Sequence, residues 1–338
     1  MKNLKKINSN FVLLVLGLII TFQSCTDKPI PIKINRFDQD LFDSISVQNP
    51  EHFLALQKKY PVFYNSFAQD MLNISEEERV DAYEPSLSKF ISFPTILQLK
   101  HEVDSVYPNL SAIEAQLGGA MVIYRKEFPE NVTPQFISFI SEFGYANVTF
   151  DSIVGIGLDM YLGSDYPLYP ALEFPDFMIA KLKSAYIVPN AIKAIAIGKF
   201  ENQLIDKRFL AMMLFEGKVR YFMKQLLPQL NDSLIFGYSP SQLAWANSNE
   251  AAVWSHLIEK KMLFNAEPNQ YMRYFNDGPF TIAPGMPQES APAIGVFIGY
   301  KIIEKYMDKQ SSVSLHELMN DANWDKILRE SAYKPYKK

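Results

Sequence analysis

Apolar positions recur three or four residues apart along most of the chain, the spacing that places them on one face of a helix. Ser314 and Glu317 have the spacing of a capping box, as do Ser111 and Glu114, and this predicts where two of the helices begin. A Ser-Pro pair at 239–240 predicts a third start. The stretches with this helical pattern are 111–128, 239–247, 292–307 and 314–328.

The segment "NVTPQFISFISEFG" (131–144) has the same features in compact form. Thr133 suits an N-cap, Pro134 suits the first turn, and Gly144 suits the left-handed position after a helix. Phenylalanine and isoleucine residues between them form a wide apolar face. We therefore expect a helix over 131–144.

The segment 292–307 is apolar on several sides, which predicts a helix near the centre of the core. Gly295 and Gly299 form a pair of small residues four apart, and this spacing permits close contact with a second helix. Lys301 and Glu304 exclude a membrane dimerisation motif.

One stretch departs from the helical pattern. Residues 145–163 are rich in β-branched and aromatic side chains, alternate around Val148 and Phe150, and then become almost wholly apolar. This predicts one or two strands, the second buried on both faces. The expected fold class is therefore mainly α with a small β-sheet (α+β).

The N-terminus contains a short apolar run, Phe11–Phe22, preceded by lysines without acidic residues. Twelve residues are too few to cross a bilayer, which takes roughly 20, but they match the apolar core of a signal peptide. The run is followed by Cys25, the single cysteine of the chain. We therefore expect a lipoprotein signal peptide at 1–24, a lipidated Cys25 that anchors the protein to a membrane, a tether over 25–36, and a single mostly helical domain over 37–338.

The charge balance limits the partners. The whole chain has 33 Lys and Arg against 37 Asp and Glu, a net charge of −4. Removal of the leader would take away three lysines and no acid. A mildly acidic protein lacks the electrostatic footprint for nucleic acid, and one cysteine offers no internal disulfide.

Standard catalytic signatures are missing from the sequence. There is no phosphate-binding loop and no Gly-x-Ser-x-Gly elbow. The four histidines, His52, His101, His256 and His316, are not spaced three or four residues apart, as a zinc pair on a helix would be. We therefore expect no cofactor and no metal.

Several segments together resemble one known family. Taken in their order along the chain, these segments resemble the gliding-motility lipoprotein GldB family of Bacteroidetes. The most specific of them contains "GLDMYLGSDYPLYP". This resemblance implies an envelope lipoprotein that is required for gliding and is associated with other envelope proteins of the gliding and secretion machinery. Thr26-Asp27-Lys28 lack an acidic export run, so we expect the periplasmic side of the outer membrane. The segments that carry the resemblance are 36–43, 155–170, 186–196, 215–228, 293–307 and 321–335.

A more distant resemblance, to a family of predicted zinc-dependent peptidases, bears on mechanism. In that family one helix carries His-Glu-x-x-His and a later Glu-Gly supplies a third ligand. The matching positions here are Pro189, Asn190 and Lys193, none of which suits its role, whereas Glu216-Gly217 matches. The resemblance implies a degenerate zinc-peptidase-like helical domain, a pseudo-peptidase with a vestigial cleft formed by Asp159, Pro189, Asn190, Lys193 and Glu216.

Three functions stay open on the sequence. The first, which we favour, is a non-enzymatic role through protein–protein contact. The second is a hydrolase that uses Glu216 with Asp159 and a recruited histidine. The third is a periplasmic protein that binds peptide or glycan through a loop carrying Tyr161, Tyr166 and Tyr169. Structural roles compete with the cleft, because Glu216 could pair with Lys218 or Arg220 on its own helix and Asp159 could close a strand end.

Overall fold

The computed structural model describes residues 30–43 and 50–335. It consists mainly of helices around a four-stranded sheet, so the expected α+β class is confirmed. The strands are β1 (Ile34–Arg36), β2 (Gln135–Phe139), β3 (Asn147–Phe150) and β4 (Ile153–Gly157). The helices are α1 (Phe37–Asp40), α2 (Pro50–Lys59), α3 (Pro61–Ser66), α4 (Glu84–Ser92), α5 (Pro94–Val106), α6 (Ser111–Glu127), α7 (Leu168–Ala171), α8 (Asp176–Ile179), α9 (Ile187–Phe200), α10 (Phe209–Leu226), α11 (Asp232–Phe236), α12 (Pro240–Glu259), α13 (Pro268–Tyr271), α14 (Ile294–Lys309), α15 (Leu315–Asn320) and α16 (Trp324–Ser331).

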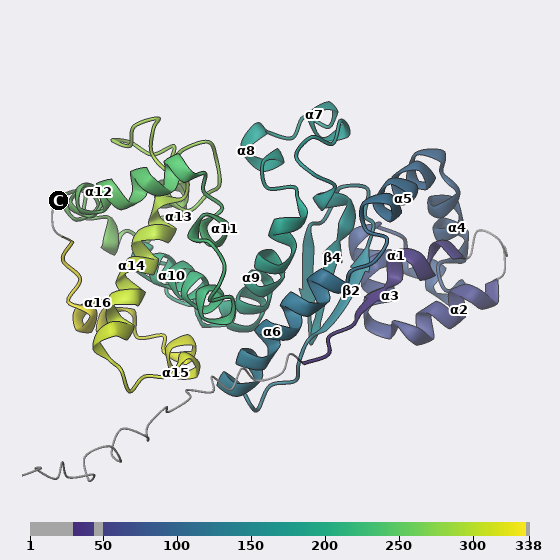
Figure 1. Ribbon diagram of the computed structural model, residues 1–338, viewed down its shortest axis with the longest axis horizontal. Helices are drawn as coiled ribbons and strands as arrows, with labels where there is room; N and C mark the ends of the chain where they lie inside the picture. Colours follow the sequence, from purple (N-terminus) through teal and green to yellow (C-terminus); the bar gives the residue numbers. More distant parts are fainter. Residues whose placement is uncertain (1–29, 44–49, 336–338) are drawn as a thin grey trace, which may run out of the picture.

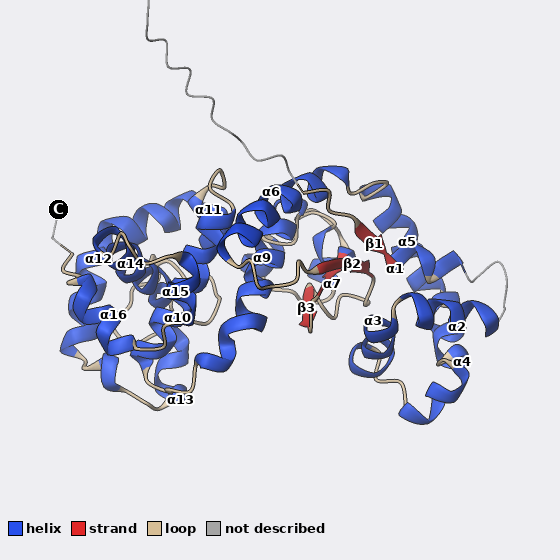
Figure 2. Ribbon diagram, turned by 90° about the horizontal axis from the view of Figure 1, so that it is seen from below, coloured by secondary structure: helices blue, strands red, loops and turns tan. Residues whose placement is uncertain are grey.

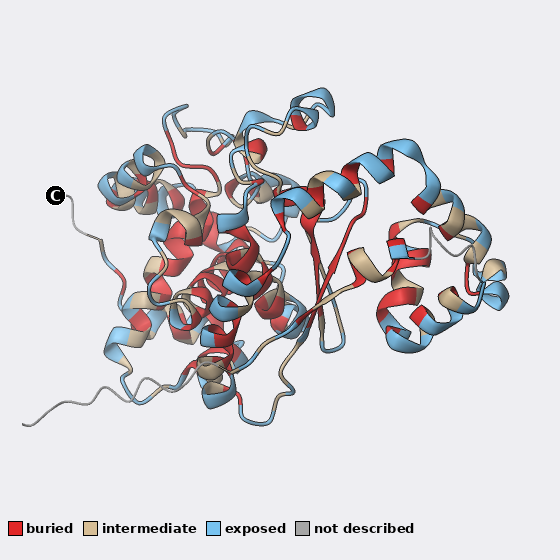
Figure 3. Ribbon diagram, turned by 45° about the vertical axis from the view of Figure 1, so that its right-hand side comes forward, coloured by how far each residue is buried: buried red, intermediate tan, exposed pale blue. Residues whose placement is uncertain are grey.

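The elements follow one another along the long axis of the molecule (Figure 1). Helices α1 to α5 form one end, the sheet with α6 and α9 forms the middle, and α10 to α16 form the other end, an arrangement also visible from below in Figure 2. Buried hydrophobic residues from Ile34 to Tyr333 make one contiguous cluster. Figure 3 shows this buried interior in the C-terminal helices, the sheet and the N-terminal helices.

The sheet has the strand order β1-β2-β4-β3, with β2 parallel to both β1 and β4. Strand β3 runs antiparallel to β4 and joins it through the turn Asp151-Ser152, where Asp151 has a left-handed φ of 51°. Val154 and Ile156 of β4 are buried, as the apolar run 145–163 predicted.

The prediction of a helix over 131–144 is wrong, because this segment contains strand β2. Phe136, Ile137 and Phe139 are all almost fully buried, on both faces of a strand that has a neighbour on each side. An apolar run of this length suits a buried strand as well as a helix. The pairing with β1 and β4 decides between them.

The two predicted capping boxes have different outcomes. Ser314 and Glu317 form theirs at the start of α15, although 314–328 is two helices rather than one. At α6 the box is absent, because Glu114 instead accepts a hydrogen bond from the backbone N–H of Ile34 at 2.9 Å. Glu114 therefore satisfies a donor of the edge strand β1 instead of its own helix.

Helices α10 and α14 are in close contact at Gly299, one of the two glycines that permitted such a contact, whereas a Cβ built on the other, Gly295, would lie 2.6 Å from the ring of Phe275. A Cβ built on Gly299 would lie 1.8 Å from the carbonyl oxygen of Met213, and one built on Gly217 would lie 2.3 Å from the carbonyl carbon of Gly299. Only hydrogen fits at these positions, so the two backbones touch directly.

The N-terminal segment enters the fold earlier than the tether boundary suggested. Residues 34–36, expected at the end of the tether, form the edge strand β1, and Ile30 donates a backbone hydrogen bond to Gly118. Cys25 and the predicted leader 1–24 lie outside the described residues. Among the described residues, no helix combines the length and apolar character needed to cross a membrane.

Candidate functional site

The positions that match the zinc-peptidase motif lie on α9 and α10, two helices in contact between the sheet and the C-terminal helices. Pro189 is buried in the first turn of α9, where a backbone N–H is not needed. Asn190 and Lys193 follow on α9, and Glu216 lies on α10. The other four residues of the predicted cleft divide into two groups.

Asp159 and Asn190 belong to a buried network beside the sheet. Asp159 follows β4, is fully buried, and accepts backbone hydrogen bonds from Ser141 at 3.1 Å and Phe143 at 2.7 Å through Oδ2. Burial is the largest cause that raises the pKa of Asp159 to about 6. Phe143 has a left-handed φ of 64°, so Asp159 holds the turn that ends β2, in keeping with the strand-closing alternative.

The tyrosines of the predicted binding loop belong to the same network. Tyr161 and Tyr169 are buried, and Tyr166 is half-buried with its hydroxyl donating to Glu102. Asn190 donates to the Tyr161 hydroxyl at 3.0 Å, and that hydroxyl donates to Asn147 at 2.7 Å. Two of these three rings therefore fill the core, and the structure does not place the three on an open surface.

Lys193 and Glu216 belong to a second group, at the α9–α10 contact. Glu216 pairs with Arg220 one turn later, with Oε2 3.3 Å from Nη1, as one of the structural alternatives predicted. Its other proposed partner, Lys218, is buried elsewhere, with its Nζ donating to the carbonyl of Asp321 and lying over Trp324. Arg220 is the largest cause that lowers the pKa of Lys193, to about 8, followed by burial, and Glu216 acts in the opposite direction.

Tyr238, in the link between α11 and α12, completes this group. Its ring is 4% exposed, and its hydroxyl is influenced by the charges of Arg220 and Asp277. Lys181 forms an ion pair with Asp277 at 2.6 Å and lies against Gly237, the neighbour of Tyr238. We refer to Lys181, Lys193, Glu216, Arg220, Tyr238 and Asp277 as the α9–α10 cluster.

The α9–α10 cluster does not suit a divalent metal. Glu216 is the one carboxylate that the motif carries over, and it is neutralised by Arg220. Lys193 would stand near the metal with a positive charge of its own. In the described part of the chain, no group of three or more His, Cys, Asp or Glu residues is placed to hold a metal ion.

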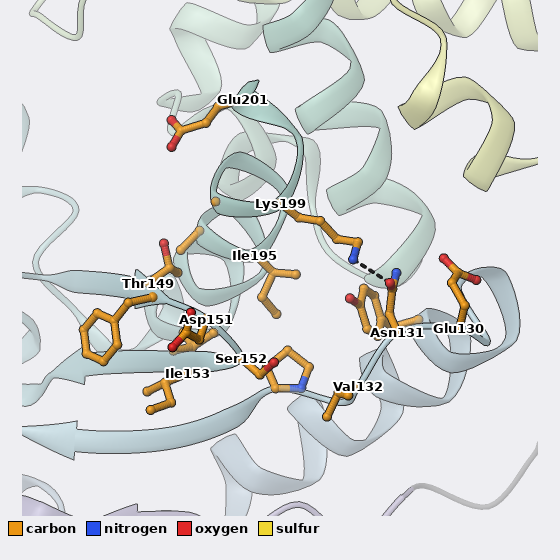
Figure 4. Close-up of a pocket in the computed structure, with 16 residues that line it drawn as sticks. Glu130, Asn131, Val132, Thr149, Asp151, Ser152, Ile153, Ile195, Lys199 and Glu201 are labelled. Carbon is orange, nitrogen blue, oxygen red and sulfur yellow. Dashed lines mark hydrogen bonds between the residues drawn. The ribbon is translucent and has the colours of Figure 1, made fainter. Parts of the chain in front are cut away.

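A separate cavity of about 400 Å³ lies beside the β3–β4 turn and the end of α9 (Figure 4). Lys199 reaches across it to donate a hydrogen bond to Asn131 at 2.5 Å. Glu130, Asp151 and Glu201 give it a mainly acidic lining. None of the residues predicted to form the cleft or the binding loop lies in this lining.

Sequence reasoning missed Tyr238, Lys181 and Asp277 as members of a site. Arg220 could be found from its spacing to Glu216, because charged residues four apart on a helix are neighbours. The other three come from separate segments and carry no motif. Their contribution depends on how the tertiary fold brings together the segments that follow α8, α11 and α13.

Comparisons with known proteins agree with the family resemblance found in the sequence. No curated protein and no solved structure matches the chain. The model of one family, described as gliding motility protein GldB, matches residues 23–335, which is nearly the whole chain. The chain therefore belongs to the GldB family of gliding motility proteins.

Proposed function

We propose that this protein is an envelope lipoprotein that serves gliding motility through contacts with other envelope proteins and not through catalysis. Membership of the GldB family supports the link to gliding. The non-enzymatic role rests mainly on one observation: the position where a zinc ligand would be needed holds Lys193, with Arg220 beside it and paired to Glu216. A metal and an activated water would both require these charges to be reversed.

We further propose that acyl chains on Cys25 hold the protein at the periplasmic face of the outer membrane. Stable anchoring takes two lipid chains or one chain with a second signal, and a processed lipoprotein cysteine supplies enough. From Ile30 onward the chain packs against α6, so the anchor would hold the folded body close to the membrane surface.

Gene replacement in the native bacterium tests both proposals. A deletion strain should lose gliding, wild-type protein should restore it, and Cys25→Ser should fail to restore it while the protein leaves the membrane fraction. A deletion strain that glides normally would refute the role.

Asp159→Asn separates the non-enzymatic role from the hydrolase alternative. The amide oxygen can still accept the two backbone hydrogen bonds that hold the turn after β2. We expect full gliding at equal protein levels, checked by immunoblot. A folded Asp159→Asn protein that is present but does not support gliding would favour a hydrolase that uses this carboxylate.

A further inference from the structure

Three polar side chains at the α9–α10 cluster have no hydrogen-bond partner among the residues that the structure describes. Arg220 is 8% exposed, its Nε is buried without a hydrogen bond to any described residue, and its Nη1 makes none either, although it lies 3.3 Å from Oε2 of Glu216 in their ion pair. The hydroxyl of Tyr238 is also buried without a hydrogen-bond partner among the described residues. Lys193 is half-buried, and its ammonium has no hydrogen bond or ion pair within the described ranges. Buried donors are almost always satisfied in folded proteins, so the unsatisfied donors of Arg220 and Tyr238 need an explanation.

The charges of the cluster do not balance either. Lys181 is paired with Asp277, and Arg220 is paired with Glu216, although its guanidinium keeps donors to spare. With Lys193 included, the cluster therefore has one positive charge more than its two carboxylates balance. Two cations held together in a partly buried place cost free energy unless an anion joins them.

We propose that the α9–α10 cluster binds one carboxylate group, held by the Lys193 ammonium, the Arg220 guanidinium and the Tyr238 hydroxyl. A carboxylate has a single negative charge, which matches the single unbalanced positive charge. It also has two oxygens that can accept from all three donors. The carboxylate would come from the C-terminus or an acidic side chain of a peptide, or from a free organic acid.

The cluster has a solvent-facing side through which such a group can enter. The side chain of Glu216 is 20% exposed and that of Asp277 is 50% exposed. The ion pair of Lys181 with Asp277 lies on this side and joins segments nearly a hundred residues apart in the chain. Arg220 and Tyr238 are buried and Lys193 is half-buried, so the three donors are less exposed than Asp277 at the edge of the cluster.

The titration of Lys193 is consistent with this arrangement. Arg220 and burial together lower its pKa to about 8. A carboxylate bound beside the ammonium would act in the opposite direction, so binding near pH 8 should be accompanied by proton uptake. Proton uptake is measured by calorimetry in buffers of different ionisation enthalpy.

Titration of the full-length protein in detergent with sodium acetate tests the proposal directly. At pH 7 and constant ionic strength, we expect one acetate per protein, with a dissociation constant on the order of millimolar. Lys193→Met should weaken binding about tenfold or more, because it removes a charge-assisted hydrogen bond. Tyr238→Phe should weaken it about 2–10-fold, the value of one neutral hydrogen bond.

The chain offers a matched control for Tyr238→Phe. The hydroxyl of Tyr83 is also buried without a partner among the described residues, and it lies just before α4 at the other end of the molecule. Tyr83→Phe should therefore leave acetate binding unchanged. Because neither hydroxyl has a partner to lose, both variants should fold, and a purely structural role for Tyr238 predicts identical behaviour of the two.

The source of the carboxylate is distinguished by two blocked dipeptides, one with a free C-terminal carboxylate and one with a C-terminal amide. Tighter binding of the acid than of acetate indicates a peptide C-terminus, and equal binding indicates a small organic acid. The proposal is overturned if the amide binds as well as the acid, if acetate fails to bind, or if Tyr238→Phe binds acetate like Tyr83→Phe. This outcome does not depend on the gliding role, which the deletion strain tests separately.

Discussion

Helix α10 presents two faces that differ in almost every respect, although the residues concerned are neighbours in sequence. Gly217 faces α14, where it lies against the backbone of Gly299 and leaves no space for a side chain. Glu216 and Arg220 face α9 and form a partly buried ion pair whose donors are incompletely used. The first face is tightly packed and specifies the fold, whereas the second is polar and contains donors without hydrogen-bond partners in the described part of the chain. Natural proteins depart from close packing and from complete hydrogen bonding of buried groups mainly where a function requires it.

Gly299→Ala should break the closed face and have the largest effect. The added methyl would lie 1.8 Å from the carbonyl oxygen of Met213, and a backbone atom cannot move aside as a flexible side chain would. We expect a loss of about 3 kcal/mol or more in the free energy of unfolding, measured by denaturant titration.

The matched control is Gly119→Ala on α6, where nothing lies within 4 Å of the added methyl. This variant should gain up to about 1 kcal/mol, because alanine is a better helix former than glycine. Similar unfolding curves for the two variants would contradict the close approach of α10 and α14.

Glu216→Gln should have the next largest effect and tests the polar face. It leaves the size of the side chain unchanged but removes the counter-charge of the buried Arg220. We expect a loss of about 2 kcal/mol in the free energy of unfolding, less than the 3–5 kcal/mol of a fully buried pair because Glu216 is partly exposed.

Glu330→Gln is the control for that substitution, because Glu330 pairs with the exposed Arg329 on α16. An exposed pair contributes little, so the change should be below about 0.5 kcal/mol. If Glu216→Gln is as mild as Glu330→Gln, the α9–α10 ion pair does not contribute to stability.

Lys193→Met should have the smallest effect and the opposite sign. The pKa of Lys193 is lowered from 10.5 to about 8 in the folded protein, so its charged form is disfavoured by folding. That cost is fully present below pH 8 and disappears as the pH rises through 10.5, where the unfolded lysine also loses its proton. We expect Lys193→Met to be more stable than wild type by about 1 kcal/mol at pH 7, without added carboxylate.

The pH dependence provides the check on that prediction. Thermal unfolding of both proteins between pH 7 and pH 10 should show the advantage of Lys193→Met shrinking as the pH rises. An advantage that is constant with pH would mean that the methionine gains by packing alone and that Lys193 bears no unbalanced charge.

Local signals in the sequence were sufficient for several elements. The capping box of Ser314 and Glu317 is satisfied within four residues, so no distant partner is required to form it. The same holds for the start of α12 at Ser239 and for the ion pair of Glu216 with Arg220. The spacing of Gly295 and Gly299 permitted a close helix contact, and Gly299 makes it with α10, whereas Gly295 lies against Phe275.

Local signals failed where a distant segment competes for the same residues. Glu114 has the spacing to cap its own helix, but the edge strand β1 presents the Ile34 N–H, and the carboxylate bonds there. The apolar run at 135–139 suits a helix or a strand. Because β1 and β4 lie on either side of it, its backbone groups form hydrogen bonds with both as a strand. In both cases the deciding partner lies tens of residues away.

The sequence by itself therefore determined the helical class, the place of several helices in the second half of the chain, the family and the absence of a zinc-peptidase motif. Only the tertiary structure decided which polar groups would be left without partners. Glu216 and Arg220 could be paired from their spacing, but the burial of donors of Arg220 and Tyr238 without a partner among the described residues depends on how α10 and the α11–α12 link pack in the fold. Satisfaction of a buried donor is a property of everything packed around it, and no local pattern contains that information.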